Sequence, residues 1–331
     1  MSNDLRPKAP NDGSEPRRSR PRPAAMSYLS RRLASLVVTP VVALALVACS
    51  ASGGGPSIAP TAAPSGAPSA EPSSSPAVGA IDHKTGATDI VLRYDEGGGF
   101  VPPSFFAAAA PHFTLYGDGT VIFRNPMLEA PPAQGSVFMA NPMRTAKLSE
   151  EQVQELLTIA LGEGGLATAR PNYTNDMVAD ASTAIFTIEA AGIKKTVSVY
   201  ALGMDTQGGA DAPARAGFQK LAQRLADFDQ GGSIETAVYE PEAYRGILFE
   251  AQGVTAPDIR TWPWPDLTPA DFSADPDPEG LQFPHRRMTP QEVDLLEVTD
   301  YQGGFQNLVI SDPEGKTYTF SLRPLLPGEP D

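Results

Sequence analysis

The stretch HFTLYGDGTVIF, residues 112–123, decides the fold class of this chain of 331 residues. Its two halves, His112 to Tyr116 and Thr120 to Phe123, are rich in β-branched and aromatic residues and flank Gly117-Asp118-Gly119. Such a pattern predicts two antiparallel strands joined by a short, glycine-bearing loop. The fold therefore contains at least one hairpin that is specified locally.

Further hairpins are predicted along the chain. Two more segments have strand-like runs around a turn that contains glycine: residues 183–200, around Ala190-Ala191-Gly192, and residues 306–322, around Asp312-Pro313-Glu314-Gly315. Another strand is indicated at residues 90–94, just before Gly97-Gly98-Gly99.

Three segments have apolar residues at helical spacing: residues 148–162, 213–228 and 289–296. The first begins with Ser149 as N-cap and Gln152 three residues later, which is a capping box, and Gly162 marks its end. The third begins at Thr289 and has Pro290 at its first helical position.

Antiparallel hairpins packed with a few amphipathic helices predict an α+β fold. A capped helix is followed by a hairpin twice, which suggests two related subdomains, residues 81–232 and 233–331, the second including a proline-rich loop at 255–284. In a true duplication the first copy would carry an insertion around residues 163–181. The alternative is that a capped helix plus a hairpin recurs simply because it is a common unit.

Residues 1–48 have the layout of an export signal. Arg31 and Arg32 precede the mostly apolar residues 33–48, and this run ends before Cys49, the single cysteine of the chain. An apolar region of about 7–15 residues is typical of a signal peptide, whereas a transmembrane helix needs about 20. We therefore expect a signal peptide at 1–48, for which Met26 is a second candidate start.

The order Leu46-Val47-Ala48-Cys49 resembles the lipobox of bacterial lipoproteins. This resemblance implies cleavage before Cys49 and lipidation of that cysteine, and with two or three acyl chains the anchor on a membrane would be stable. A plain secretory signal with a chance cysteine and an uncleaved anchor are the alternatives. The general secretory route is favoured over twin-arginine export, because Ala34 and Ser35 stand where the latter prefers bulky apolar residues.

Residues 49–80 are expected to be a tether. Prolines recur every fourth position from 56 to 76, separated mostly by Ala, Ser, Gly and Thr with Glu71 as the one charge, and such a composition cannot bury a core. The segment would span between roughly 30 Å as a coil and somewhat under about 100 Å when extended.

Short stretches of the remaining chain resemble bacterial secreted and lipid-anchored proteins of unknown function: Gly98-Gly99-Phe100-Val101-Pro102-Pro103, Leu115-Tyr116-Gly117-Asp118-Gly119 and Leu322-Arg323-Pro324-Leu325-Leu326-Pro327. This resemblance implies no particular activity.

The charge of the chain changes sign along its length. Residues 1–48 carry a net charge of +5, which leaves −19 for the remainder of a chain whose formal net charge is −14. Such an acidic surface repels phosphate backbones and anionic headgroups, so nucleic acid is excluded as a partner. We expect the membrane to be reached through lipid on Cys49, and an envelope protein or glycan to be the other candidate partner.

Patterns for catalysis and metal binding are sparse. Histidine occurs only at positions 83, 112 and 285, and the folded part contains no cysteine, so zinc-type pairing and a cysteine nucleophile are excluded there. The sequence predicts no catalytic residue and no cofactor. The series Asp275-x-Asp277-x-Glu279-Gly280 imitates a calcium loop, but Arg286 stands where a bidentate glutamate is needed.

Two groups of residues remain as candidate ligand contacts. Asp176 and Asp180 lie in an oxygen-rich loop, which is either a divalent-cation site or a solvated loop. Trp262 and Trp264 project to the same side of an extended segment, so they could stack on a sugar or fill a partner's pocket, although such a pair more often covers a core. Four other aromatic residues are predicted to be core: Phe105, Phe106, Tyr239 and Tyr244.

These observations favour an exported, lipid-anchored, extracytoplasmic module of the cell envelope that binds a partner or acts as a scaffold without catalysis. The alternative is an extracytoplasmic hydrolase that uses carboxylates, with or without calcium; it requires two acidic side chains that converge in a cleft. A solute-binding protein is disfavoured, because its two α/β lobes would alternate strands with helices and this chain is dominated by hairpins.

Overall fold

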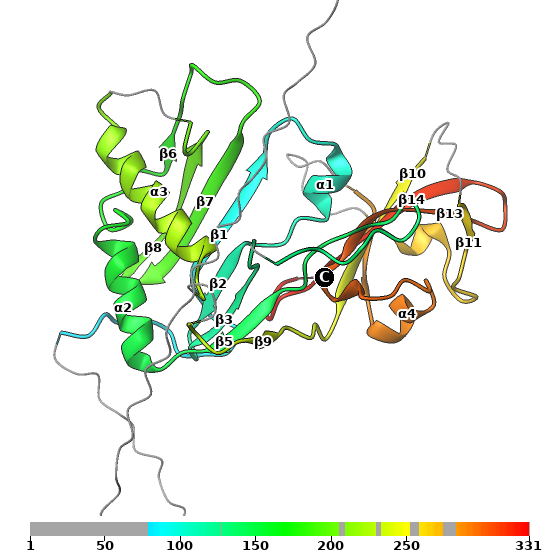
Figure 1. Cartoon of the computed structure of the whole chain (residues 1–331), viewed down its shortest axis with the longest axis horizontal. Coiled ribbons are helices and arrows are strands. Elements are labelled where there is room, and N and C mark those ends of the chain that lie inside the picture. The colour runs from blue at the N-terminus through cyan, green and yellow to red at the C-terminus, as the bar shows by residue number, and fades with distance from the viewer. Residues whose placement is uncertain are drawn as a thin grey trace, which may run out of the picture. The chain divides into compact units, whose positions relative to one another are not determined.

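The computed structural model describes six stretches of the chain: residues 79–126, 128–204, 209–229, 233–251, 258–273 and 283–330. All of them belong to one compact unit, Pro72–Asp331. They form an α+β fold, as predicted, in which two mostly antiparallel sheets pack against helices (Figure 1). Within these stretches no helix has the length and apolar character needed to cross a membrane.

Eight strands form the first sheet, in the order β6-β8-β7-β1-β2-β3-β5-β9. Their bounds are β1 Ile90–Gly98, β2 Phe113–Tyr116, β3 Thr120–Phe123, β5 Arg144–Lys147, β6 Asn172–Tyr173, β7 Ser182–Ala190, β8 Ile193–Tyr200 and β9 Ala237–Val238. Neighbouring strands run antiparallel except β6 and β8, which are parallel.

The first two predicted hairpins are confirmed. β2 pairs with β3 in the register Phe113↔Phe123, and Gly119 in the turn has φ +83°. β7 and β8 are joined by Ala191 and Gly192, whose φ angles of +54° and +69° are both positive. Two positive φ angles are what a two-residue turn needs if its twist is to match that of the strands, and glycine supplies one of them at no steric cost.

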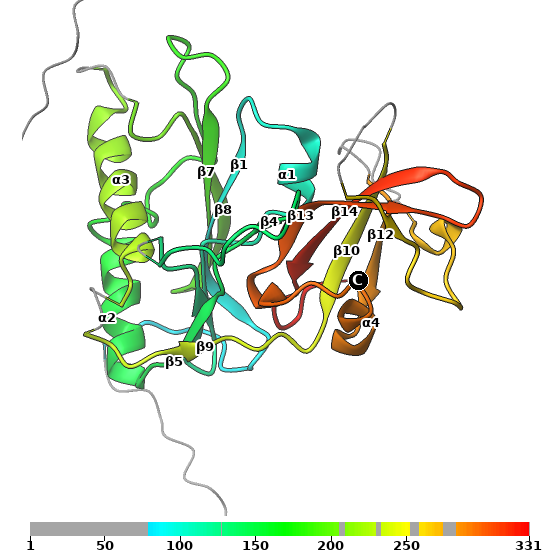
Figure 2. The same cartoon turned by 45° about the vertical axis from the view of Figure 1, so that its right-hand side comes forward.

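Two long helices, α2 (Glu150–Leu161) and α3 (Ala212–Ala226), cover one face of the first sheet (Figure 2). The predicted capping box of Ser149 and Gln152 is present at the start of α2. α2 ends at Leu161, as expected, but its C-cap Gly162 has φ −87° and is not in the left-handed region. Aromatic rings stack in the core between the sheet and α3. The ring centroids of Tyr94 and Phe186 lie 5.0 Å apart, and those of Phe186 and Phe218 lie 5.9 Å apart.

The second sheet has the order β11-β13-β14-β10-β12, and β4 pairs with β13 outside this order. Its strands are β4 Phe138–Met139, β10 Tyr244–Glu250, β11 Arg260–Thr261, β12 His285–Met288, β13 Phe305–Ser311 and β14 Thr317–Pro324. Beside it lie α4 (Pro290–Asp294) and the 3₁₀ turns η1 (Pro269–Asp271) and η2 (Tyr301–Gly303). The predicted start of α4 at Thr289 is confirmed, and Thr289 forms a capping box with Glu292. The third predicted hairpin is β13–β14, with Gly315 at φ +86° in its turn.

The two sheets are tied together by short strands and by buried charges. β9 follows the predicted boundary at 232/233 but pairs with β5 of the first sheet. β4 precedes this boundary but pairs with β13 of the second sheet. Glu329 accepts a 2.8 Å hydrogen bond from Arg323 of β14 and lies 3.7 Å from Arg93 of β1. Each sheet therefore takes a two-residue strand from the other side of the predicted boundary at 232/233.

The two helix–hairpin units differ in how their hairpins join the sheet. In the first sheet the leading strand of the hairpin, β7, bonds to β1. In the second sheet the trailing strand, β14, bonds to β10. The two units thus share an order of elements along the chain but not an order of strands in their sheets.

Candidate functional site

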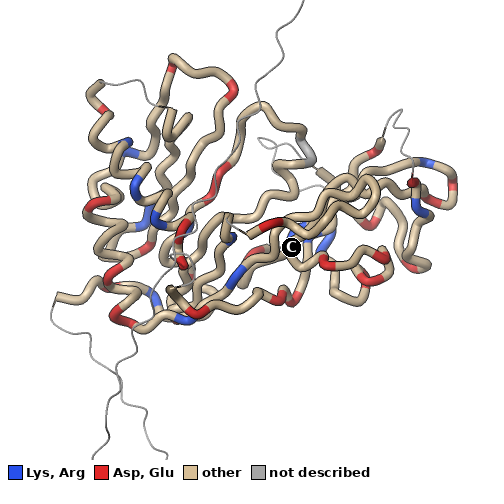
Figure 3. The backbone as a smooth tube through the Cα atoms, in the orientation of Figure 1, with Lys and Arg blue, Asp and Glu red and all other residues tan. Residues whose placement is uncertain are grey.

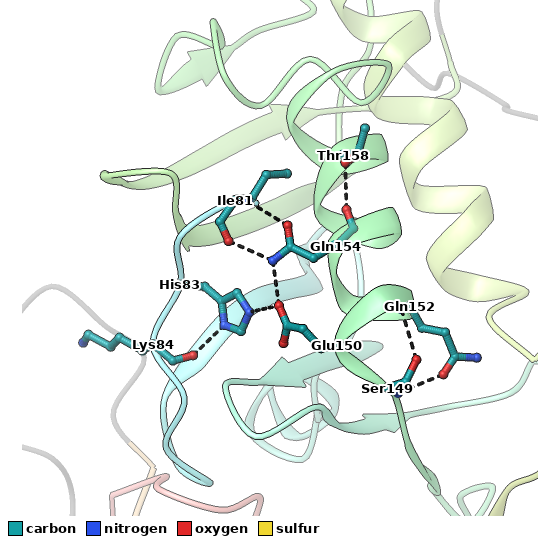
Figure 4. Close-up of polar contacts among 8 residues, drawn as sticks. All are labelled: Ile81, His83, Lys84, Ser149, Glu150, Gln152, Gln154 and Thr158. Atoms are coloured by element: carbon teal, nitrogen blue, oxygen red, sulfur yellow. Dashed lines mark hydrogen bonds and ion pairs between the residues drawn. The ribbon is translucent and has the colours of Figure 1, made fainter. Parts of the chain in front are cut away.

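The chain enters the first sheet through a strap, residues 81–84, that is held against α2 (Figure 4). The Gln154 side chain forms hydrogen bonds with both main-chain groups of Ile81: its Oε1 accepts from Ile81 N at 2.6 Å and its Nε2 donates to Ile81 O at 2.9 Å. The His83 ring lies between Lys84 O, 2.6 Å from Nδ1, and Glu150 Oε1, 3.2 Å from Nε2. We call this part of the first sheet the strap end.

Charged side chains close the strap end over the β7–β8 turn. The Ala191 amide donates to Asp82 O at 2.7 Å, and Glu189 accepts from Lys84 at 2.7 Å and from Lys194 at 3.0 Å. A hollow of about 300 Å³ lies here, and these same side chains line it. The hydrogen bond from Lys84, together with that from Lys194, lowers the pKa of the Glu189 carboxyl. Glu189 is therefore a permanent counter-ion, unsuited to donate a proton at neutral pH.

At the opposite end of the same strands, β1 extends further than its neighbour β2. Its pairing with β7 continues to Gly98↔Ser182, whereas its pairing with β2 stops at Tyr94↔Phe113. The last four residues of β1 therefore have a strand on one side only. We call this part of the sheet, with residues 95–106, 174–181 and 201–204, the loop end.

A hollow of about 200 Å³ lies beside the unpaired half of β1. It is lined by residues of β1, of α1 (Pro103–Ala107) and of the start of β2 and β7: Glu96, Gly97, Gly98, Val101, Phe105, Phe106, Ala109, His112 and Ser182. Small-molecule sites usually occupy about 300–1,000 Å³. This hollow fits one side chain better than a cofactor.

Ionisable groups at the loop end are held by burial and by each other. Burial and a hydrogen bond to Glu96 raise the pKa of the Tyr94 hydroxyl, which donates to the Glu96 carboxylate. Burial also raises the pKa of Asp95, whose Oδ1 accepts from the Glu96 amide at 2.8 Å. Because consecutive residues of a strand point to opposite faces, Asp95 and Glu96 do not form a converging pair of carboxylates.

Large apolar side chains are exposed in the loops of the loop end, and two of them, Val101 and Phe105, line the hollow. Phe100 is 90% exposed and Met177 81%, and three further residues of the same loops are also exposed: Val101, Phe105 and Met204. The loops are held side by side, because the Phe100 amide donates to Asp180 O at 3.2 Å and Asn175 Nδ2 donates to Met204 O at 3.4 Å. The prediction that Phe105 belongs to the core is wrong, since α1 is too short to bury both Phe105 and Phe106.

The structure brings the predicted contacts Asp176 and Asp180 to the loop end. Both side chains are exposed, and Asp180 has φ +57°, the left-handed conformation that aspartate tolerates better than most residues. Among the described residues no three His, Cys, Asp or Glu side chains are grouped as metal ligands would be. A ligand contact of the two aspartates stays a prediction; their exposed carboxylates form an acidic rim of the loop end.

The two tryptophans lie elsewhere, in the core of the second sheet. Their rings meet edge to face with centroids 5.0 Å apart, and both indole N–H groups are used, by Leu267 O and by Glu292 O, each at 2.8 Å. Both project into one cluster, as their spacing indicated, but Trp264 is only 3% exposed. Trp264 is thus a core residue, the position that such a pair more often takes, and the half-buried Trp262 packs against the same aromatic cluster. A ligand contact of either tryptophan stays a prediction.

The calcium-like series of Asp275, Asp277 and Glu279 lies outside the described residues. Cys49 and the proline-rich segment after it also lie outside them. The lipidation of Cys49 therefore stays a prediction.

Sequence reasoning missed the unpaired half of β1, with Glu96, Gly98 and His112 around it. A signal was present: three consecutive glycines are followed by Phe100 and Val101, apolar residues that no strand or helix pattern places in a core. Gly98 and Gly99 have φ +80° and +90°, so they turn the chain away from the sheet and expose these side chains.

The loop end thus combines the end of β1, which has no partner on its β2 side, with a hollow, exposed apolar side chains and an acidic rim. Comparison with known proteins does not identify these features, since no family model matches the chain and neither a curated protein nor a solved structure matches it.

Proposed function

We propose that this chain is a bacterial lipoprotein, anchored by lipid on Cys49, whose folded part binds a partner on the extracytoplasmic side of a membrane without catalysis. The observation that carries the proposal is the position of the sole cysteine. It ends an apolar run that follows Arg31-Arg32, and a proline-spaced segment begins right after it. Lipid attached there would hold the module at a membrane despite its acidic surface.

The form of the first sheet supports a binding role. Its strap end, where the proposed tether joins the domain, is closed by hydrogen bonds and ion pairs. Its loop end, about 30 Å away along the nine residues of β7, exposes Phe100 and Met177. Exposed apolar groups gathered in one place mark interaction sites more often than chance.

The anchor is tested by replacing the cysteine in the full chain, produced in a bacterium that processes lipoproteins. We expect Cys49→Ala to abolish incorporation of labelled palmitate and to move the protein out of the membrane fraction. The control is Ser57→Ala, which changes a residue of the proposed tether and should leave both measurements unchanged. Membrane partition that is the same for Cys49→Ala and the unsubstituted chain would contradict the proposal.

A further inference from the structure

The main-chain groups of Glu96 and Gly98 face the side of β1 on which β2 is missing. The Arg124 amide donates to His112 O at 2.9 Å, so residue 112 and its alternates on β2 bond to β3. Phe113 consequently bonds to its partner Tyr94 on β1. The same alternation along β1 directs the N–H and C=O groups of Glu96 and Gly98 to the side of Tyr94's partner.

β2 cannot extend to cover these groups. The residue before His112 is Pro111, which has no N–H to donate to a ladder. Among the described strands, none continues the ladder beside Glu96 and Gly98. The Glu96 amide is bonded instead to the Asp95 carboxylate, a local side-chain contact of the kind that takes the place of a strand partner.

The surroundings of this edge fit a peptide. The hollow of about 200 Å³ lies against it, with the apolar side chains Val101 and Phe105 in its wall. An extended peptide added to a strand edge gains affinity from main-chain hydrogen bonds and specificity from pockets that accept its alternate side chains. Both elements are present within the last four residues of β1 and the helix beside them.

The charge of the loop end selects the class of partner. Glu96, Asp176 and Asp180 are acidic, and residues 95–112 and 171–182 contain no Lys or Arg. Figure 3 shows acidic positions and no basic ones on the ends of β1 and β7. A segment rich in Lys or Arg is attracted to such a rim, whereas an anionic lipid surface and a second copy of this acidic chain are repelled.

We propose that β1 accepts an extended segment of a basic partner protein as an added strand beside Glu96–Gly98, with one apolar side chain of that segment in the hollow. This inference deepens the binding role proposed above and rests on it.

The test uses the full chain, purified in detergent, and a synthetic heptapeptide that alternates lysine and valine around a central phenylalanine. Binding is measured by fluorescence anisotropy of a labelled peptide. A second peptide of the same sequence has alternate amide nitrogens methylated, so it keeps charge and apolar surface but cannot pair as a strand. We expect its affinity to be weaker by about tenfold or more, as the loss of one or two hydrogen bonds predicts.

Two substitutions in the chain provide matched pairs. A Cβ at Gly97 meets no atom within 4 Å and Gly97 is not left-handed, so Gly97→Ile should fold normally, fill the hollow and weaken binding about tenfold or more. Phe105→Ser removes a wall of the hollow at a side chain that is 43% exposed. Its control is Leu295→Ser, a comparable exposed apolar residue (49%) beside α4, which should not change binding.

Three results would overturn the inference. They are no binding of the unmethylated peptide up to about 1 mM, equal binding of both peptides, and equal binding by Gly97→Ile and the unsubstituted chain. Self-association that Gly97→Ile abolishes would assign the edge to a second copy and overturn the choice of a basic partner. Because the anchor is measured separately on Cys49→Ala, failure here leaves the lipoprotein proposal standing, and the reverse also holds.

Discussion

The two ends of the first sheet differ in how the same strands are held and covered. At the strap end side chains hold the chain in place: Gln154 bonds to both main-chain groups of Ile81, and Glu189 pairs with Lys84 and Lys194 beside the β7–β8 turn. At the loop end β1 extends beyond β2 and is paired on its β7 side only, and the side chain of Phe100, just after β1, is 90% exposed. The difference separates an end of the sheet that is held by side-chain contacts from the end that the proposed partner would reach.

An unpaired strand with exposed apolar residues is a liability that proteins usually remove with charges, proline or cover. The outer edge of β8 is treated in this way, because Lys195 reaches across to Ala167 O and Ala169 O. The loop end has no such protection from lysine. The edge of β8 is thus protected by a lysine side chain, whereas the edge of β1 beside Glu96 and Gly98 is not. This difference agrees with the proposed strand addition at β1.

The largest expected effect on stability comes from breaking the turn that opens the loop end. Gly99 has φ +90°, and a Cβ there would lie 3.3 Å from the Ser182 amide nitrogen. Gly99→Val should therefore lower the free energy of unfolding by about 1–2 kcal/mol from backbone conformation alone. Gly97→Val is the control, expected to stay within about 0.5 kcal/mol because its side chain meets open space.

Urea unfolding of the two glycine variants checks this difference. If Gly99→Val were as stable as Gly97→Val, the loop end would not depend on the left-handed turn, and Phe100 would have to be exposed for another reason.

A smaller effect is expected when the strap is released. Gln154→Ala removes both hydrogen bonds to Ile81, and a net loss of about 1 kcal/mol is typical for such bonds. The loss should be local, so hydrogen exchange of the Ile81 amide should accelerate while amides of β1 and β7 stay protected. Glu155→Ala, at an exposed position one residue further along α2, is the control. Unchanged exchange at Ile81 would show that the strap is held by other contacts.

The elements on which this comparison rests were largely predictable from the sequence, because they are specified by local signals. Alternating apolar residues with a glycine turn predicted β2–β3, β7–β8 and β13–β14, and caps such as Ser149 and Thr289 marked helix starts. β10 was missed, since Gly246 interrupts its apolar run. That glycine is required because a Cβ there would lie 2.4 Å from Met288 Sδ, a contact between strands distant in sequence.

The open edge of β1 could not be predicted for a related reason. Whether Glu96 and Gly98 have a second partner, on the side opposite β7, depends on where β2 begins, and that depends on Pro111 and on the register between β1 and β2. The burial of Trp264 is also tertiary: the sequence favoured a core position for the tryptophan pair, but Phe320 and Phe272, which bury Trp264, reach it only in the folded chain. The glycine run at 97–99 marks where β1 ends, but which side of β1 lacks a neighbour is decided by contacts between segments distant in sequence.

The smallest expected effect is a difference between the two ends in how the free energy of unfolding depends on pH. Burial raises the pKa of Asp95 in the folded state, although the hydrogen bond from the Glu96 amide and the charges of His112, Arg93 and Arg323 oppose the shift. The contribution of Asp95 to stability is therefore present below the ordinary aspartate value of about 3.9 and is lost as the pH rises through the raised value. Asp95→Asn should therefore match the unsubstituted chain in acid and become the more stable of the two toward neutral pH.

Glu189 at the strap end has the opposite sign. Its pKa is lowered by Lys84 and Lys194, so its contribution is present above the ordinary glutamate value of about 4.3 and is lost as the pH falls through the lowered value. Glu189→Gln should thus be the less stable chain at neutral pH and lose this difference in acid, by a small amount because the pair is solvated. Urea unfolding of both variants between about pH 3 and pH 7 brackets the two ordinary values. Slopes of the same sign would mean that the two ends are electrostatically alike and that burial of Asp95 does not distinguish the open edge of the sheet from the closed one.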